Sequence, residues 1–329
     1  MKRVEELGER KIIRIIQSHL DLMPKMPIPF GDDVSACDIG KGELAILKTD
    51  MLVARTDVPA GMSLWQAARK AVVMNVSDFA AKGVKPCAML VSLGLPKGTA
   101  ETDVKELARG LNDGAREYDT YVIGGDTGEA SDIVICISLF GTAAKGKVIL
   151  RSGAALGDLL ATTGSFGKTP AGLKILLNDL EVSEETRKVL VDSVLLPHAR
   201  LKEGLALSST GAVTAAIDSS DGLAWSLHEI SRASNVGFLV DKLPIASEAE
   251  RFAENNSMDP AELALYGGEE YEIILTVKPR LWSQAEKAVR RIGGRLLQMG
   301  RVTAEKRILL EMKGKKRAIK PRGYEHFKT

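Results

Sequence analysis

The chain has 329 residues, of which 45% are hydrophobic, 45 are basic and 43 are acidic. This length is typical of about two domains, and the near balance of charge predicts neither a nucleic-acid partner nor an anionic membrane surface. No apolar run approaches the ~20 residues of a membrane span, and the start lacks the apolar core of a signal peptide. Three scattered cysteines fit a reducing compartment, and four histidines lack zinc-site spacing. We therefore expect a cytoplasmic globular protein whose metal ligands are oxygen atoms.

In the first half, apolar spacing and turn residues predict alternating helices and strands. Ser63 and Gln66 form a capping-box pattern that opens one helix, and Gly83 ends it. The predicted elements are a helix over 4–20, a strand over 44–47 that runs into Thr49 and Asp50, the capped helix, a helix over 103–117, and strands over 121–123 and 133–140 that flank a turn at 124–126.

A hinge-like turn at 144–147 precedes a second series of helices and strands, so we place a domain boundary between residues 148 and 149. The resulting domains are 1–148 and 149–329. The second half is predicted to hold strands over 158–162, 212–217, 237–240, 271–277, 296–302 and 308–312, and helices over 171–177, 184–195, 201–208 and 281–292. Both halves mix the two element types, which predicts an α/β (α+β) fold of two mixed domains.

Seven aspartates stand beside Gly, Ser, Thr or Asn where an apolar segment is expected to end. They are Asp32, Asp33, Asp50, Asp78, Asp126, Asp218 and Asp221. A helix N-cap explains any one of them. Together they favour a metal site, because carboxylates brought together repel one another unless cations or protons neutralise them. Magnesium binds carboxylates and bridges to phosphate oxygens, so the leading hypothesis is phosphoryl transfer, with Asp32 the weakest member of the set.

Two glycine-rich segments invite a phosphate-binding interpretation. The segment 164–169 ends in Gly-Lys-Thr, but Thr162 stands where the P-loop pattern requires glycine and Pro170 follows at once, so we interpret it as a turn that leads into a helix. The segment Gly-Gly-Asp-Thr at 124–127 exposes backbone N–H groups that suit a phosphate or a metal-bound water. A plain tight turn explains that segment equally well.

The order of these segments resembles thiamine-monophosphate kinase, of the superfamily that includes aminoimidazole ribonucleotide synthetase and selenophosphate synthetase. The motifs that carry the resemblance are Gly31-Asp32-Asp33, Thr49 to Val53, Asn75 to Asp78, Gly124 to Thr127, Arg151 to Ala154, Asp218 to Leu223, Gly267 to Glu269 and Gly323-Tyr324. The resemblance spans nearly the whole chain. It implies a homodimer formed through the N-terminal halves, whose sheets join into a barrel, with ATP bound near that interface.

The resemblance further implies direct transfer of the γ-phosphoryl group of ATP to thiamine monophosphate, giving thiamine diphosphate without a protein nucleophile. Several magnesium ions would be held by Asp33, Thr49, Asp50, Asp78, Asp126, Asp218 and Asp221. ATP would contact Gly125, Asp126, Arg151 and Ser220, and the substrate would contact Asp57, Glu269 and Tyr324. Two positions depart from the family pattern. Asp57 occupies the position at which the family has a substrate-contacting histidine. Lys48 occupies the position of a hydroxyl residue, and this change either removes a metal contact or supplies a positive charge in its place.

Two alternative functions stay open. An aminoimidazole ribonucleotide synthetase-like ligase would share the fold and the use of ATP but would close a ring. A non-catalytic sensor would bind ATP through the same acids without turnover. Two other relatives fit less well. A selenophosphate synthetase would need a reactive cysteine before the Gly-Asp-Asp turn, but the first cysteine here, Cys37, comes after it. The hydrogenase-maturation relative uses a cysteine at its C-terminal end, which the last residues of this chain lack.

Overall fold

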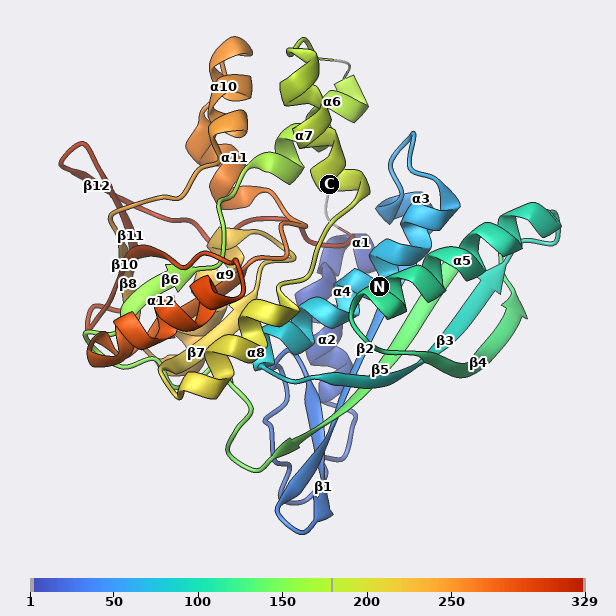
Figure 1. Cartoon of the computed structure of the whole chain (residues 1–329), viewed down its shortest axis with the longest axis horizontal. Helices are drawn as coiled ribbons and strands as arrows, with labels where there is room; N and C mark the ends of the chain where they lie inside the picture. Colours follow the sequence, from blue (N-terminus) through green and yellow to red (C-terminus); the bar gives the residue numbers. More distant parts are fainter. Residues whose placement is uncertain (1–2, 179, 328–329) are drawn as a thin grey trace.

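Two β-sheets, one from each half of the sequence, organise the computed structural model, which describes residues 3–178 and 180–327 (Figure 1). The strands of the first sheet lie in the order β1-β2-β5-β3-β4. They are β1 (Ser35–Gly40), β2 (Glu43–Val53), β3 (Pro86–Leu95), β4 (Val122–Glu129) and β5 (Val134–Ala144). β3 and β4 pair in parallel, so a crossover helix, α5 (Glu101–Glu117), connects them.

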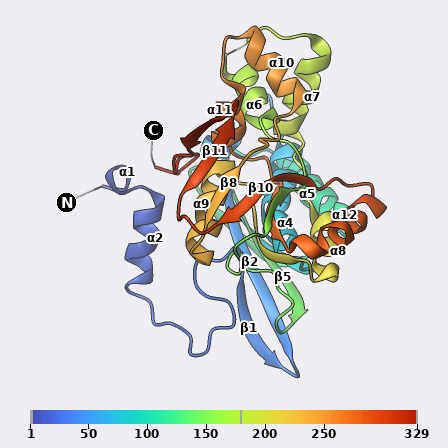
Figure 2. The same ribbon diagram turned by 90° about the vertical axis from the view of Figure 1, so that its left-hand side faces the viewer.

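The remaining helices of the first half are α1 (Val4–Leu7), α2 (Glu9–Gln17), α3 (Ala54–Asp57) and α4 (Leu64–Lys82). The capping box of Ser63 and Gln66 opens α4 as predicted, and Gly83 ends it with a left-handed φ of 64°. α4 is buried along most of its length, because it packs against β2 and β5 on one side and against the second half of the chain on the other (Figure 1). α1 and α2 lie at the periphery (Figure 2).

The second sheet has the strand order β12-β11-β8-β10-β6-β9-β7. Its strands are β6 (Leu159–Thr162), β7 (Val213–Asp218), β8 (Gly237–Val240), β9 (Ile273–Val277), β10 (Leu297–Thr303), β11 (Ile308–Met312) and β12 (Lys315–Ala318). Its helices are α6 (Lys168–Asn178), α7 (Glu184–Leu195), α8 (Leu201–Thr210), α9 (Leu223–Ser234), α10 (Ser247–Asn255), α11 (Pro260–Tyr266), α12 (Trp282–Arg291) and the 3-10 turn η1 (Pro279–Leu281). The mixed α/β character of both halves is confirmed.

The two halves meet along α4. One apolar core continues from Ile46 and Val76 in the first half to Leu275 in the second. α8 approaches α4 at backbone distance, since a Cβ atom added to Gly204 would lie 1.9 Å from the carbonyl oxygen of Ala80. The position of the domain boundary, between residues 148 and 149, stays a prediction.

Three local predictions are wrong. The helix expected over 4–20 is interrupted, because Gly8 adopts a φ of 72° and separates α1 from α2. The strand expected over 44–47 continues to Val53, so Asp50 lies inside β2 and not after it. The turn expected at 124–126 belongs to β4, because ladder bonds to β3 keep it extended and a side chain at Gly125 would collide with the carbonyl oxygen of Val91.

The first sheet is open within this chain. β1 and β4 form its two edges in the described residues, so the sheet does not close on itself as a barrel. In the same part of the chain, no helix combines the length and the apolar composition needed to cross a bilayer.

Candidate active site

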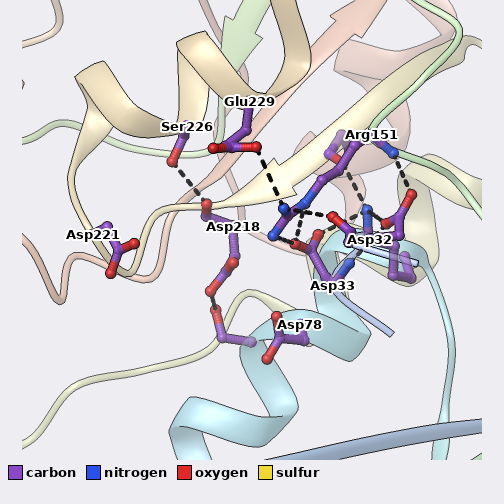
Figure 3. Close-up of polar contacts among 12 residues, drawn as sticks. Asp32, Asp33, Asp78, Arg151, Asp218, Asp221, Ser226 and Glu229 are labelled. Atoms are coloured by element: carbon purple, nitrogen blue, oxygen red, sulfur yellow. Dashed lines mark hydrogen bonds and ion pairs between the residues drawn. The ribbon is translucent and has the colours of Figure 1, made fainter. Parts of the chain in front are cut away.

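Three buried aspartates from distant segments converge where the two halves meet. Asp33 follows the turn before β1, Asp78 lies on α4, and Asp218 is the last residue of β7. One carboxylate oxygen of each lies within 4.8 Å of the others, and the three residues are 4%, 6% and 4% exposed (Figure 3). Such a cluster requires nearby positive charge, since buried carboxylates are costly when they are not compensated.

Local structure fixes each carboxylate. Ser77, on the turn of α4 that carries Asp78, donates a hydrogen bond to Asp218 at 2.7 Å and so ties the helix to β7. Ser226 on α9 donates to the backbone oxygen of Asp218 at 3.0 Å. The backbone N–H of Asp33 donates to the side chain of Asp32 at 2.8 Å, which shapes the turn. The cluster is therefore positioned by the packing of α4 against the second half.

Two cations, the buried Lys82 and the half-buried Arg151, hold the Gly-Asp-Asp turn. The Nζ atom of Lys82 lies 2.7 Å from both Asp32 and Asp33 and donates to the carbonyl oxygen of Ala216 at 2.8 Å. Arg151 donates through Nε to Asp33 at 2.6 Å and through a terminal nitrogen to the carbonyl oxygen of Gly31 at 2.8 Å. These contacts join the turn to both halves of the chain (Figure 3).

A third cation, Lys48 on β2, lies on the other side of the cluster. Its Nζ atom is 2.8 Å from Asp78 and 3.9 Å from Asp50. Asp50 therefore joins the cluster through the shared lysine. Burial would lower the pKa of Lys48, but Asp78 and Asp50 outweigh it and raise the pKa above its ordinary value, so the side chain is a permanent cation.

Burial and the neighbouring charges shift the pKa values of the three acids in different directions. Burial acts to raise the pKa of Asp33, but Lys82 and Arg151 overcome it, and the pKa falls below 3.8. Burial and the neighbouring acids raise the pKa of Asp78 well above 3.8, despite Lys48. Burial and the charge of Asp33 raise the pKa of Asp218 to about 6. A divalent cation would relieve this repulsion, and the donor set of carboxylate oxygens suits magnesium.

Three of the predicted metal ligands, Thr49, Asp126 and Asp221, lie outside this cluster. Thr49 points to the opposite face of the sheet from Asp50, where it donates to the carbonyl oxygen of Ile137 at 3.0 Å. Asp126 is exposed on the edge strand β4, and its side chain forms no hydrogen bond or ion pair with a described residue. The strand register places neighbouring Gly125 three strands away from Asp50, about 14 Å at ~4.8 Å per strand.

The segment after β7 connects the acidic cluster to two other predicted segments. The carbonyl oxygen of Ser220 accepts from the N–H of Glu269 at 2.6 Å, and that of Asp221 accepts from the N–H of Tyr324 at 3.1 Å. Asp221 lies apart from the buried trio, 3.6 Å from Arg10 of α2 (Figure 3). Burial and Glu9 raise the pKa of Asp221 to about 6.

The three residues predicted to contact the substrate lie near one another. Lys70 on α4 places its Nζ atom 2.5 Å from Glu269 and donates to the backbone oxygen of Asp57 at 2.8 Å. Burial, followed by the charges of Asp57 and Glu269, raises the pKa of Tyr324. Glu269 holds a left-handed φ of 61°, a strained conformation that is frequent at ligand sites.

The sequence interpretation overlooked Lys70, Ser77 and Lys82. All three lie on α4, which is buried along most of its length and also carries Arg69, Asn75 and Asp78. The available signal was this set of charged and polar residues among the alanines and valines of one helix, at spacings that bring Lys82 close to Asp78.

The segment 164–169 is not a phosphate-binding loop. The N–H of Gly167 donates to Glu270 at 2.5 Å, and Thr163 donates to Glu272 at 2.7 Å. The loop is thus lined by carboxylates, which would repel a phosphate.

Comparison with known proteins identifies the family. The model of the AIR synthase related protein N-terminal domain matches residues 31–143, and that of the C-terminal domain matches residues 156–313. The thiamine-monophosphate kinases of Nitrosopumilus maritimus and Pyrococcus horikoshii are each 34% identical over 325 residues, with 99% and 98% of this chain and 100% and 97% of the relatives covered.

A solved structure described as AaThiL complexed with AMPPCP and TMP superposes with a TM-score of 0.86 at 28% identity, covering 99% of both chains. The two family models together span most of the chain, and the named relatives match over nearly their whole length. The chain therefore belongs to the thiamine-monophosphate kinase family, among the AIR synthase related proteins.

Proposed function

We propose that this protein transfers the γ-phosphoryl group of ATP to thiamine monophosphate and produces thiamine diphosphate. The observation that carries the proposal is the convergence of Asp33, Asp78 and Asp218 at the junction of the two halves. The full-length similarity to thiamine-monophosphate kinases supports it. So does the described complex of a structural relative with AMPPCP and TMP, an ATP analogue and a compound whose abbreviation fits thiamine monophosphate.

Magnesium would be held by Asp33, Asp78 and Asp218, with Asp50 and Asp221 at either side of them. Their oxygen atoms suit a hard cation, which would offset the burial and the mutual repulsion that raise the pKa values of Asp78 and Asp218. When bound, magnesium supplies charge neutralisation to a polyphosphate. We propose that Thr49 and Asp126 also bind magnesium. Because they lie away from the buried trio, the ions that they bind would be ones that arrive with the nucleotide.

The protein's own side chains position the reactants. Arg151, fixed by Asp33 and Gly31, would present its remaining donors to a phosphate, and Ser220 and Gly125 would contact the nucleotide. Asp57 and Glu269 form an anionic region that suits the permanently charged thiazolium ring of the substrate. No nucleophile is required, because phosphoryl transfer depends mainly on positioning and charge.

We also propose a homodimer in which the open sheets of two chains join into a barrel. Large apolar side chains are exposed on the face of the first sheet that points away from α4. They include Leu47, Met51, Leu90 and Phe140. Contiguous exposed apolar surface of this kind typically marks an interface between proteins. We propose a cytoplasmic location on the basis of the unpaired cysteines.

One assay tests the proposed reaction. The purified protein is incubated with magnesium, ATP and thiamine monophosphate, and the products are separated by chromatography. We expect thiamine diphosphate and ADP in equal amounts, and neither in the absence of magnesium. ATP binding without any diphosphate would favour the sensor, and turnover only with the ring-closure substrate of aminoimidazole ribonucleotide synthetase would favour the ligase.

A further inference from the structure

Lys48 differs from the other lysines near the acidic cluster in what holds it. Lys82 is fully buried and donates to the backbone oxygen of Ala216, and Lys70 donates to that of Asp57. These backbone contacts anchor α4 and neighbouring segments. Lys48 is 21% exposed at its side chain, and among the described residues its ammonium group forms ion pairs with the carboxylates of Asp78 and Asp50 and no hydrogen bond to a backbone oxygen. It is therefore held in place by opposite charge.

The charges of the cluster show what Lys48 contributes. Among the described residues, the carboxylates are Asp32, Asp33, Asp50, Asp78 and Asp218, and the cations in contact with them are Lys48, Lys82 and Arg151. When all five acids are ionised, five negative and three positive charges leave a net charge of −2, which one divalent ion neutralises. Without Lys48 the net charge would be −3.

We propose that the Lys48 ammonium group is a resident cation that takes the place of one metal ion at this site. It lies within hydrogen-bond distance of Asp78 and within ion-pair distance of Asp50, two carboxylates that could otherwise share a magnesium ion. Magnesium would have to approach these oxygens to about 2.0–2.1 Å. An ammonium nitrogen 2.8 Å from Asp78 occupies that space. The inference rests on the proposed magnesium site.

The test counts bound ions and does not depend on turnover. Mn2+ is titrated into the full-length protein with saturating AMPPCP, and free Mn2+ is measured by electron paramagnetic resonance. We compare the unchanged protein with Lys48→Thr, which removes the charge and offers a hydroxyl oxygen, and Lys48→Arg, which keeps the charge. Lys85→Met serves as a control, because Lys85 forms an exposed ion pair with Asp119.

We expect Lys48→Thr to bind one Mn2+ ion more per chain than the unchanged protein, and Lys48→Arg and Lys85→Met to bind the same number as the unchanged protein. An equal count in Lys48→Thr would overturn the inference while leaving the magnesium site intact. No protein-dependent Mn2+ binding by the unchanged protein would overturn the magnesium site and the inference together. Circular dichroism checks folding, and Lys48→Gln, a neutral side chain of similar length, replaces Lys48→Thr if that variant is unfolded.

Discussion

Replacing Asp218 by asparagine should make the metal-free protein more stable and the enzyme much less active. The substitution keeps an oxygen that can accept the hydrogen bond from Ser77 and removes one negative charge from the buried cluster. Burial and Asp33 raise the pKa of Asp218 from 3.8 to about 6. This rise corresponds to roughly 3 kcal/mol of destabilisation when the group is ionised.

The sign of the pH dependence follows from that rise. The folded state binds the proton more tightly than the unfolded state, so the contribution of Asp218 to the free energy of unfolding falls as the pH rises from about 4 to about 6. Urea unfolding in EDTA should therefore show Asp218→Asn to be more stable than the unchanged protein at pH 8, by up to about 3 kcal/mol, and nearly equal at pH 4. Turnover with magnesium should fall on the order of 100-fold or more, as when a single charge-stabilising group is lost.

Asp158 provides a matched control. It is also buried, but it accepts hydrogen bonds from Thr214 at 2.6 Å and from the N–H of Ala155 at 2.9 Å, away from the acidic cluster. Asp158→Asn should lose stability and keep near-normal turnover. If Asp218→Asn were less stable than the unchanged protein in EDTA at pH 8, or fully active, the electrostatic account of the site would be wrong.

Three further predictions concern other parts of the molecule. Glu269→Gln should raise the KM for thiamine monophosphate about tenfold or more and leave the KM for ATP unchanged, because it removes a negative charge at the substrate end and leaves the ammonium group of Lys70 without its carboxylate partner. Steady-state kinetics with each substrate varied in turn measures both constants. An equal rise in the two KM values would contradict the assignment of Glu269 to the substrate. Burial raises the pKa of Glu270 from 4.5 to about 7, so the free energy of unfolding of the unchanged protein should fall as the pH rises across this interval. In urea titrations, the free energy of unfolding of Glu270→Gln should depend less on pH. The same pH dependence in both proteins would refute the raised pKa. Phe140→Asp should convert a dimer to a monomer in light scattering, and a dimer of unchanged mass would exclude the proposed sheet interface.

The sequence predicted elements best where local chemistry alone determines them. α7 and β8 have the predicted bounds, and the capping box of Ser63 and Gln66 places the start of α4. The helix expected over 4–20 failed locally, at Gly8, and the other two errors fell where pairing with a distant strand decides the conformation. Gly124 and Gly125 favour a turn locally, but hydrogen bonds to β3 keep them extended. β1 and β3 were not predicted for the same reason.

The candidate site was predicted in part. Motif order indicated that Asp33, Asp78 and Asp218 act together, and the structure brings one carboxylate oxygen of each within 4.8 Å of the others. Thr49 and Asp50 were expected after a strand, but both lie inside β2, where adjacent side chains point to opposite faces, and Asp126 lies on the edge strand β4. Whether Thr49 and Asp126 bind metal stays a prediction. The sequence shows Lys70 and Lys82 on a helix with many apolar residues, but the acids that they contact are known only after folding, because Lys82 and Asp33 are far apart in sequence.

The close approach of α8 to α4 sets the dimensions of the acidic cluster. Gly204 lies against the backbone of Ala80, two residues beyond Asp78, while β7, which follows α8, ends in Asp218. A single methyl group at Gly204 would act as a wedge that spreads the two halves and separates their carboxylates. The distance between metal ligands from the two halves thus depends on Gly204, a residue that has no side chain and takes no part in the chemistry.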